Sequence, residues 1–396
     1  MTIVPQAKAR LQALNPPRHD WVLMLVTGAI LVIGTLLVWS STSANDALDG
    51  GGGTAYLRRH LVNIVIGVGL AAAVVVTDHR WVRILAPLVY AASVVGLVLV
   101  LMMGTTINGS QSWLMLGGMS LQPAEFAKLA VVVGMALLVA ERIESSPRRQ
   151  LGVLDVSLML ATAGIPALLI LLQPDLGTML VLSATVFGVL AVSGAPRRWL
   201  VGLVLSGVVL AAMVVMLGVL KSYQVNRFMA FTNPDLDPRG AGYNTTQARI
   251  AIGNGGLFGQ GLFDGSQTRS GFVPEQHTDF VFTVAGEELG LVGAGVLIAL
   301  FAVLLWRALR IATQADDMFG RVAAAGIACW FGFQTFQNIG MCLGIMPVTG
   351  VPLPLVSYGG SSMFASMVAV GLLLNLHRRA ADAPSSRLPA PRVLAR

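Results

Sequence analysis

Asp279 is the side chain in this sequence whose type and position most directly suggest chemistry. It ends a polar segment, Pro274–Asp279, immediately before a long apolar run. A carboxylate in that position can accept a proton from a substrate hydroxyl, as a general base does. It can equally cap the helix that follows, although Thr278 offers a capping oxygen as well. The residues alone leave both interpretations open, with His277 beside Asp279 as a candidate supporting residue.

Two more carboxylates, Glu287 and Glu288, lie inside the apolar run that follows Asp279. An α-helix turns once in about 3.6 residues, so Glu287 falls near the helix face of Asp279, roughly two turns away. Carboxylates in such surroundings are costly unless they are paired or face a water-filled cavity. Glu287 is therefore either a partner in helix packing or a second candidate for supporting Asp279.

Glu125 and Lys128 form another constellation of charges within an apolar run. Their i, i+3 spacing places them on one face of a helix, where they can neutralise each other. A structural ion pair is the simpler interpretation. The functional alternative is a polar cavity within the membrane, in which Lys128 faces an anionic group.

Two segments combine proline and glycine in a way that interrupts helices. In Gln173–Thr178, Pro174 and Gly177 end one apolar run and start the next, and Asp175 is a plausible cap. The segment Gly350–Ser362 carries two prolines and several glycines at membrane depth. Non-helical backbone is tolerated there only where protein buries it or where it lines a polar cavity. We therefore expect the second segment either to line such a cavity or simply to bend the chain.

Several other chemistries are not supported by the sequence. The glycines of 253–261 lack the Gly-Lys-Ser/Thr of a phosphate-binding loop, and no group of His, Cys and acidic residues has zinc spacing. Cys329 and Cys342 lie in apolar stretches and are interpreted as small hydrophobic residues. The net charge of +7 comes from short basic segments between apolar runs, so nucleic acid is not an expected partner.

The elements that must position these residues are membrane-spanning helices. Of the 396 residues, 55% are hydrophobic and only 11% are charged, a balance that leaves too few polar side chains to cover a soluble domain. A spanning helix needs about 20 mostly apolar residues. Ten runs of that kind are found, near 21–40, 60–77, 81–103, 122–140, 155–172, 176–193, 199–220, 280–306, 322–346 and 355–376. Eight or nine helices remain possible if the fifth and sixth runs form one broken element.

The distribution of Lys and Arg predicts which side each loop faces. Basic residues are concentrated in alternate loops and in both terminal segments, which places both termini in the cytoplasm. The expected organisation is a cytoplasmic segment 1–20, a transmembrane domain 21–376 and a disordered cytoplasmic tail 377–396. Between helices 7 and 8 lies a large extracytoplasmic loop, 221–279, rich in aromatic residues. Within it, 242–252 is expected to form a short interfacial helix. The fold class is thus an all-α integral membrane protein.

Taken together, these segments resemble the SEDS family, the membrane glycosyltransferases of bacterial cell-wall synthesis, and within it the RodA branch more than FtsW. The matching stretches are Gln122–Lys128, Gln173–Gly177, Gly253–Gly261, Pro274–Gly290 and Pro347–Ser362. They occur in the family's order. The ten helices and the long loop between the seventh and eighth agree with the family as well.

The resemblance implies that the protein polymerises lipid II into glycan strands on the outer face of the bacterial cytoplasmic membrane, for cell elongation and rod shape. It implies Asp279 as the catalytic residue and Glu125 with Lys128 as its support. Expected partners are membrane lipid, a class B penicillin-binding protein and the proteins of the elongation complex.

Glycosyl transfer from a lipid diphosphate needs a base and positive charge for the leaving group. Candidates for that charge are Lys128, Arg227, Arg249 and Arg269. A divalent cation, Mg²⁺ or Mn²⁺, is a possible cofactor, although the sequence shows no dedicated metal cage.

Three competing functions share many of these features. A lipid II flippase or transporter would also have ten helices and charges within the membrane, but transporters place their sites near the midplane rather than in a large outer loop. A scaffold that recruits a penicillin-binding protein would not need Asp279. A polymerase of the division type would use the same site in another complex.

Overall fold

The computed structural model describes residues 19–43, 54–107, 110–116, 119–145, 151–218, 222–237 and 240–382. The predicted N-terminal segment 1–20 lies almost entirely outside these ranges. Of the predicted tail, residues 377–382 belong to the last helix, α16 (Gly360–Asp382), so the boundary at 376 was too early. The rest of that tail lies outside the described residues.

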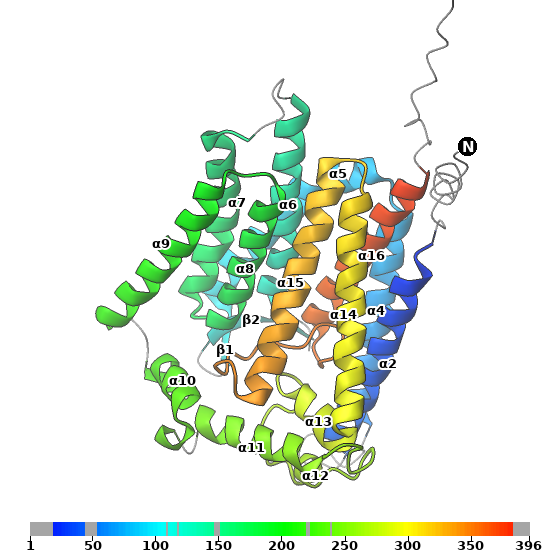
Figure 1. The fold of residues 1–396 in the computed structure, drawn as a ribbon, viewed down its shortest axis with the longest axis vertical. Helices are drawn as coiled ribbons and strands as arrows, with labels where there is room; N and C mark the ends of the chain where they lie inside the picture. Colours follow the sequence, from blue (N-terminus) through cyan, green and yellow to red (C-terminus); the bar gives the residue numbers. More distant parts are fainter. Residues whose placement is uncertain are drawn as a thin grey trace, which may run out of the picture.

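The described chain is a bundle of long helices (Figure 1). Each of the ten predicted apolar runs lies largely in one helix of this bundle: α2 (Trp21–Ser43), α4 (Ala55–Val76), α5 (His79–Met103), α6 (Pro123–Ser145), α7 (Val153–Leu172), α8 (Leu176–Val192), α9 (Arg197–Met216), α14 (Gly290–Gln314), α15 (Met318–Leu343) and α16. Eight of the described helices are long and apolar enough to cross a membrane. Helix α8 is shorter, with 17 residues, and α15 is long but is not among the eight. The all-α membrane fold is therefore confirmed.

Helices α6, α8, α15 and α16 form the centre of the bundle. Helix α15 packs against α6, α8 and α14, and α16 packs against α4 and α6. In α6 and α16, 78% and 83% of the apolar window is buried, whereas the window of α9 has no buried residue. Figure 1 shows α9 at the outer edge of the bundle. Functional groups on α6, α15 and α16 are therefore held by tight packing.

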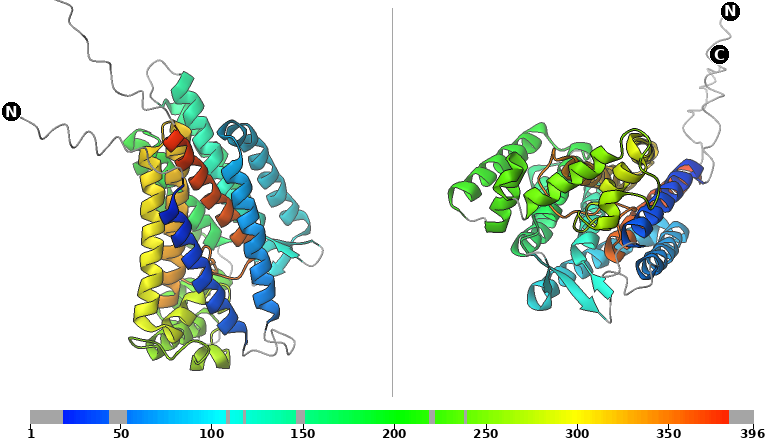
Figure 2. Two further views of the ribbon diagram at one scale, coloured as in Figure 1. Left: turned by 90° about the vertical axis from the view of Figure 1, so that its right-hand side faces the viewer. Right: turned by 90° about the horizontal axis from the view of Figure 1, so that it is seen from below.

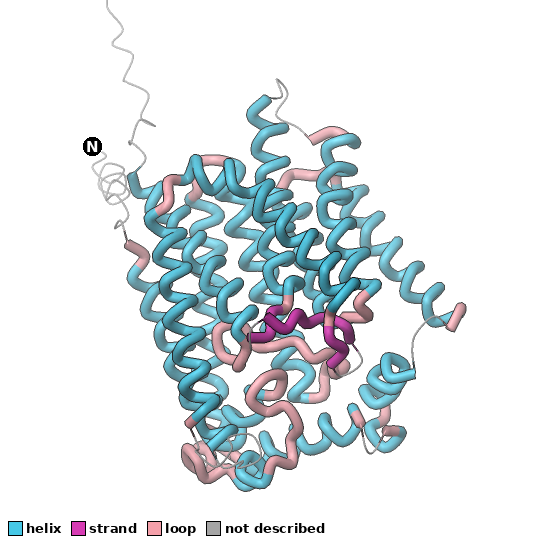
Figure 3. Tube along the Cα trace, turned by 180° about the vertical axis from the view of Figure 1, so that it is seen from behind, coloured by secondary structure: helices cyan, strands magenta, loops and turns pink. Residues whose placement is uncertain are grey.

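One end of the bundle is covered by the segment predicted as an outer loop. Helices α10 (Ser222–Thr232), α11 (Ala241–Asn254) and α12 (Ser266–Ser270), with the 3₁₀ turn η1 (Pro234–Leu236), lie across that end (Figures 1 and 2). The helix expected at 242–252 is confirmed as α11. At the same end, strands β1 (Thr105–Ile107), β2 (Ser110–Leu116) and β3 (Met119–Leu121) form an antiparallel sheet in the order β1-β2-β3, which the sequence analysis did not predict (Figure 3).

The predicted eighth span, 280–306, is broken in the structure. Helix α13 (Val281–Glu288) has its C-cap at Leu289, and α14 begins at Gly290, whose φ is +66°. The glycine-rich segment after α11 docks on this break. An added Cβ at Gly259 would lie 2.1 Å from the carbonyl oxygen of Glu288, so only glycine permits this approach. Gly255, where an added Cβ would lie 1.9 Å from the carbonyl oxygen of Gly286, and Gly259 thus serve backbone packing.

Candidate active site

Asp279 is presented by a tight turn that precedes α13. Glu275 has a positive φ of +52°, and its carbonyl oxygen accepts hydrogen bonds from the N–H groups of Thr278, Asp279 and Phe280 at 3.2, 3.1 and 3.1 Å. The N-cap of α13 is Phe280, and no side chain caps this helix. The capping interpretation of Asp279 is therefore wrong. The turn occupies its backbone and leaves its carboxylate available.

Asn338 of α15 holds this turn against the segment that follows α15. Its Nδ2 donates to the main-chain oxygen of Asp279 at 2.7 Å and to that of Val351 at 2.8 Å. Gly350 has a φ of +71°, and an added Cβ there would lie 3.2 Å from Oδ2 of Asp279. The two segments that carry Asp279 and Gly350 are thus fixed side by side.

Asp279 opens into a cavity of about 280 Å³. Its wall combines residues from segments that are far apart in the sequence: the hairpin with Ser110, Ser112, Trp113, Met115 and Ser120, then Gln122, Pro174, Asp175, Leu176, Arg227, Glu275, Thr278, Thr349, Gly350, Pro352, Tyr358, Gly359, Ser361 and Ser362. The segment Gly350–Ser362 therefore lines a polar cavity, as one of its two interpretations required. Nine of the twenty lining residues carry uncharged polar side chains, which suits a ligand with many hydroxyl groups.

The electrostatics of the cavity favour a proton acceptor at Asp279. Burial, with a smaller contribution from Glu275, raises the pKa of Asp279 from 3.8 to about 7, while Arg227 acts in the opposite direction. Within the described part of the chain, its carboxylate oxygens have no hydrogen-bond partner. A base whose pKa lies near the working pH is efficient in proton transfer.

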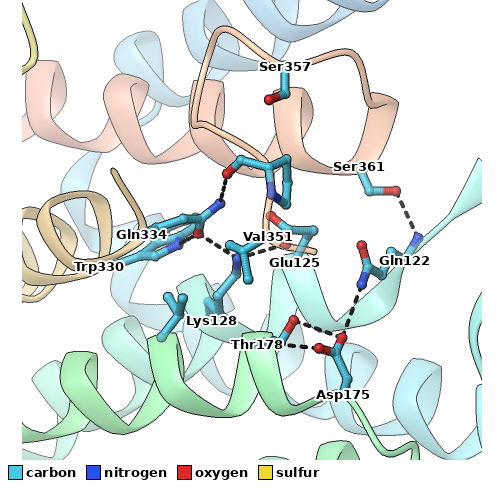
Figure 4. A network of polar contacts seen from close by, with 12 residues as sticks. Gln122, Glu125, Lys128, Asp175, Thr178, Trp330, Gln334, Val351, Ser357 and Ser361 are labelled. Carbon is cyan, nitrogen blue, oxygen red and sulfur yellow. Dashed lines mark hydrogen bonds and ion pairs between the residues drawn. The ribbon is translucent and has the colours of Figure 1, made fainter. Parts of the chain in front are cut away.

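Asp175 lies in the same wall and is engaged differently. Its carboxylate accepts hydrogen bonds from the N–H group and the hydroxyl of Thr178, at 3.0 and 2.8 Å, and from Nε2 of Gln122 at 3.3 Å (Figure 4). The predicted capping role at the start of α8 is confirmed.

Lys128 and Glu125 lie in a closed polar layer that does not line the cavity. Nζ of Lys128 contacts Oε1 of Glu125 at 2.7 Å and Oε1 of Gln334 at 2.7 Å, and it lies 5.2 Å from the ring centroid of Trp330 (Figure 4). Both charged side chains are at most 2% exposed. The structural ion pair is present. Gln334 connects Lys128 to the cavity wall, because its Nε2 donates to the carbonyl oxygen of Pro352 at 2.8 Å.

Of the three arginines predicted as ligands, the structure brings only Arg227 to the cavity. Arg249 is exposed and packs over Gly344, and Arg269 pairs with Asp264 at 3.8 Å, so neither lines that wall.

Glu287 does not face Asp279 but accepts the N–H groups of Gln267 and Thr268 at 2.7 and 2.9 Å, at the start of α12. The packing interpretation of Glu287 therefore fits the structure.

His277 packs behind the cavity wall. Its ring lies 5.1 Å from that of Tyr56 and 5.8 Å from that of Tyr358, centroid to centroid. Tyr358 lines the cavity, and its N–H donates to the carbonyl oxygen of His277 at 2.9 Å. Burial lowers the pKa of His277, so the neutral ring acts as a packing partner of Tyr358.

Three amide side chains of α15 belong to the surroundings of the site, although they were not predicted from the sequence. Gln334, Gln337 and Asn338 are spaced three and four residues apart, so they share one helix face, and all three are fully buried. Gln337 donates to the Thr349 hydroxyl at 2.7 Å, as Gln334 and Asn338 donate to nearby carbonyls. Three amides on one face of an apolar run were a readable signal for a polar contact inside the membrane.

The sequence of this chain is similar to those of known proteins. Residues 20–382 match the family model FTSW_RODA_SPOVE, described as cell cycle protein. The chain is 38% identical to a probable peptidoglycan glycosyltransferase FtsW of Trichlorobacter lovleyi, over 90% of this chain and 93% of the relative. It is 37% identical to the peptidoglycan glycosyltransferase MrdB of Escherichia coli K12, with the same coverage of 90% and 93%.

Two solved structures are similar over almost the whole chain. One is a chain from the structure of a peptidoglycan synthase complex that coordinates polymerization and crosslinking. It has a TM-score of 0.76 and 34% identity, covering 92% of this chain and 99% of that one. The other is the rod shape determining protein RodA of Thermus thermophilus, with a TM-score of 0.67 and 32% identity, covering 91% and 97%.

Proposed function

Because this chain belongs to the SEDS family of FtsW, RodA and SpoVE and is a peptidoglycan glycosyltransferase, we propose that it polymerises lipid II with Asp279 as the general base. The observation that carries the proposal is the Asp279 carboxylate itself. It opens into the cavity, has no hydrogen-bond partner in the described part of the chain, and has a pKa of about 7.

In the proposed step, Asp279 takes the proton of the attacking sugar 4-hydroxyl. The oxygen forms a bond to C1 of the donor sugar, while the bond from C1 to the diphosphate oxygen breaks. The electron pair of that bond leaves with the lipid diphosphate. Arg227, the cationic side chain among the residues of the cavity wall, is suited to stabilise the negative charge that develops there.

The closed polar layer supports this step indirectly. Lys128 and Glu125 do not line the cavity, and the bond from Gln334 to the Pro352 carbonyl connects them to its wall. We assign to them the fixing of the segment Gly350–Ser362 rather than contact with the reacting atoms. His277 has a similar supporting role through its packing against Tyr358.

A divalent cation would need ligands beyond the side chains that the structure describes. Among the described residues, no three His, Cys, Asp or Glu side chains are grouped so that they could hold a metal ion. Mg²⁺ or Mn²⁺ would therefore need ligands from the substrate diphosphate in addition to Asp279. No part of the mechanism above depends on it.

The proposed biological setting is cell elongation at the cytoplasmic membrane, with a class B penicillin-binding protein as partner. The likeness to a chain of a peptidoglycan synthase complex supports the partner, and the likeness to RodA supports elongation, although FtsW relatives are equally similar in sequence. Complementation tests the assignment. We expect the gene to restore rod shape in cells depleted of RodA and not to restore division in cells depleted of FtsW.

The decisive experiment compares Asp279→Asn with wild type on labelled lipid II, with products separated on a gel. We expect a loss of polymerisation of roughly 10²–10⁴-fold, the usual contribution of a general base. Asp264→Asn is the matched control, because Asp264 is exposed and lies outside the cavity wall. Polymerisation by Asp279→Asn at the wild-type rate would exclude Asp279 as the base.

The same gel separates the alternatives. Glycan chains formed by detergent-purified protein, with no second compartment, cannot come from a flippase. A scaffold protein would form none.

A further inference from the structure

Three helices begin at the wall of the cavity. Gln122 directly precedes α6, Asp175 directly precedes α8, and Gly359 directly precedes α16. The first N–H groups of an α-helix have no partner within the helix, and the helix dipole makes this end positive. Three such ends at one cavity would attract a negatively charged group.

At two of the three helix starts, an acidic side chain of the protein already compensates the positive potential. The carboxylate of Asp175 caps α8 through Thr178. Helix α6 has Glu125 in its first turn, where it also pairs with Lys128. The first turn of α16 contains no acidic residue, although this helix is 23 residues long. The start of α16 is therefore the end whose positive potential remains for a ligand.

The side chain of Ser362 provides a second, independent observation. Ser362 is only 6% exposed and lines the cavity, and its hydroxyl has no hydrogen-bond partner within the described part of the chain. The neighbouring hydroxyl of Ser361 differs, because it accepts the N–H group of Gln122 at 2.8 Å. A hydroxyl that is nine-tenths buried and unpaired at a helix start can donate to an anion from outside the protein.

The backbone at this position is open to close approach. A Cβ added at Gly359 would find its nearest heavy atom, Cβ of Ser362, only at 3.9 Å, and its φ does not require glycine. Packing within the protein therefore does not explain the absence of a side chain at Gly359. Glycine here leaves room for a group to reach the N–H groups that follow, as at other phosphate sites on helix ends.

We propose that the N-terminus of α16, Gly359–Ser362, binds the diphosphate of the lipid-linked donor, together with Arg227 in the same cavity. This inference rests on the proposed function and names the place of its leaving group. When the bond from C1 to the diphosphate oxygen breaks, the extra negative charge stays at the helix end. The oxygens of Asp175 already accept three hydrogen bonds and so compete less with this anion.

The test measures binding separately from catalysis. Full-length protein in phosphatidylcholine nanodiscs is titrated with undecaprenyl diphosphate. We expect Ser362→Ala to weaken binding roughly tenfold, the value of one hydrogen bond to a charged group. Gly359→Ala should weaken it at least as much, because its methyl group occupies the space of the anion. Ser366→Ala is the matched control, since Ser366 lies one turn further along α16, is buried and does not line the cavity.

Competing probes identify the source of the phosphate. Pyrophosphate should displace the lipid diphosphate, and undecaprenyl monophosphate should displace it less well. Phosphatidylglycerol that displaces it equally well would make this a phospholipid site and overturn the proposal. So would wild-type binding by both Ser362→Ala and Gly359→Ala. The binding experiment tests this inference separately from the proposed function. The proposed function is tested by the polymerisation activity of Asp279→Asn.

Discussion

The charged side chains in the cavity around Asp279 and in the closed polar layer around Lys128 differ in whether the protein supplies their hydrogen-bond partners. Lys128 has two hydrogen bonds at 2.7 Å and the face of Trp330, and it is fully buried. The carboxylate of Asp279 has no hydrogen-bond partner in the described part of the chain, and it opens into a cavity. The layer thus satisfies its charges internally and fixes the wall. The cavity keeps a charge available for a substrate, at a cost in stability.

The largest effect on folding is expected from breaking the ion pair of the closed layer. Lys128→Met leaves Glu125 charged, buried and unpaired, which typically costs about 3–5 kcal/mol. Thermal unfolding in detergent should show a strongly lowered midpoint, and polymerisation should fall with it, because Gln334 loses one of the two hydrogen bonds that its Oε1 accepts and keeps only the one from Trp330.

The double variant Glu125→Leu/Lys128→Met separates charge from packing. Replacing a buried ion pair by apolar side chains is often neutral or stabilising. We therefore expect the double variant to recover most of the unfolding midpoint. A double variant as unstable as Lys128→Met would show that the layer is held by more than charge compensation.

Removing the charge at Asp279 should stabilise the protein, whereas removing the charge of Lys128 should destabilise it. Burial raises the pKa of Asp279 from 3.8 to about 7, so between pH 4 and pH 7 the folded protein holds a proton that the unfolded chain has released. Stability therefore falls as the pH rises through this window. Asn carries no such penalty, so Asp279→Asn should be more stable than wild type at pH 8, by on the order of 2 kcal/mol, and equally stable near pH 4.

Unfolding midpoints of both proteins at pH 4.5, 6 and 8 check this difference. The midpoints should diverge progressively with pH, while polymerisation is lost at every pH. Asp264→Asn, on the exposed surface, should show no divergence. If Asp279→Asn is the less stable protein at pH 8, the carboxylate has a structural partner and the contrast with Lys128 fails.

The sequence predicted these two regions unequally. All ten apolar runs were found because hydrophobic length is a local property, and the pairing of Glu125 with Lys128 followed from helical spacing. The position of Asp279 opposite Gly350 was not predictable in this way, since α15 and Asn338 bring the two segments together. Of the two interpretations of Glu287, the one that placed it beside Asp279 failed for a related reason. The break at Leu289–Gly290 and the docking of α12 decide its partners, and neither is a local property.

The smallest expected effect concerns the neighbours of Asp279 in the cavity. Glu275 raises its pKa and Arg227 lowers it, both less than burial does. For a base that must be ionised, activity rises with pH through this pKa, near 7 in the wild type. Glu275→Gln should therefore move the rise of kcat/KM to lower pH, and Arg227→Gln should move it to higher pH, each by up to about one unit.

The direction of these two shifts carries the argument, because a general loss of structure would not move the profiles apart. Profiles of labelled lipid II consumption from pH 5 to 9 measure them, with Asp264→Asn expected to follow the wild type. Arg227→Gln should in addition raise KM, since the cation also faces the diphosphate in the proposed mechanism. Parallel shifts of both variants would mean that the titrating group is not Asp279. The carboxylate of Asp279 would then resemble Lys128 in the closed polar layer, because partners within the protein would fix its charge in the absence of substrate.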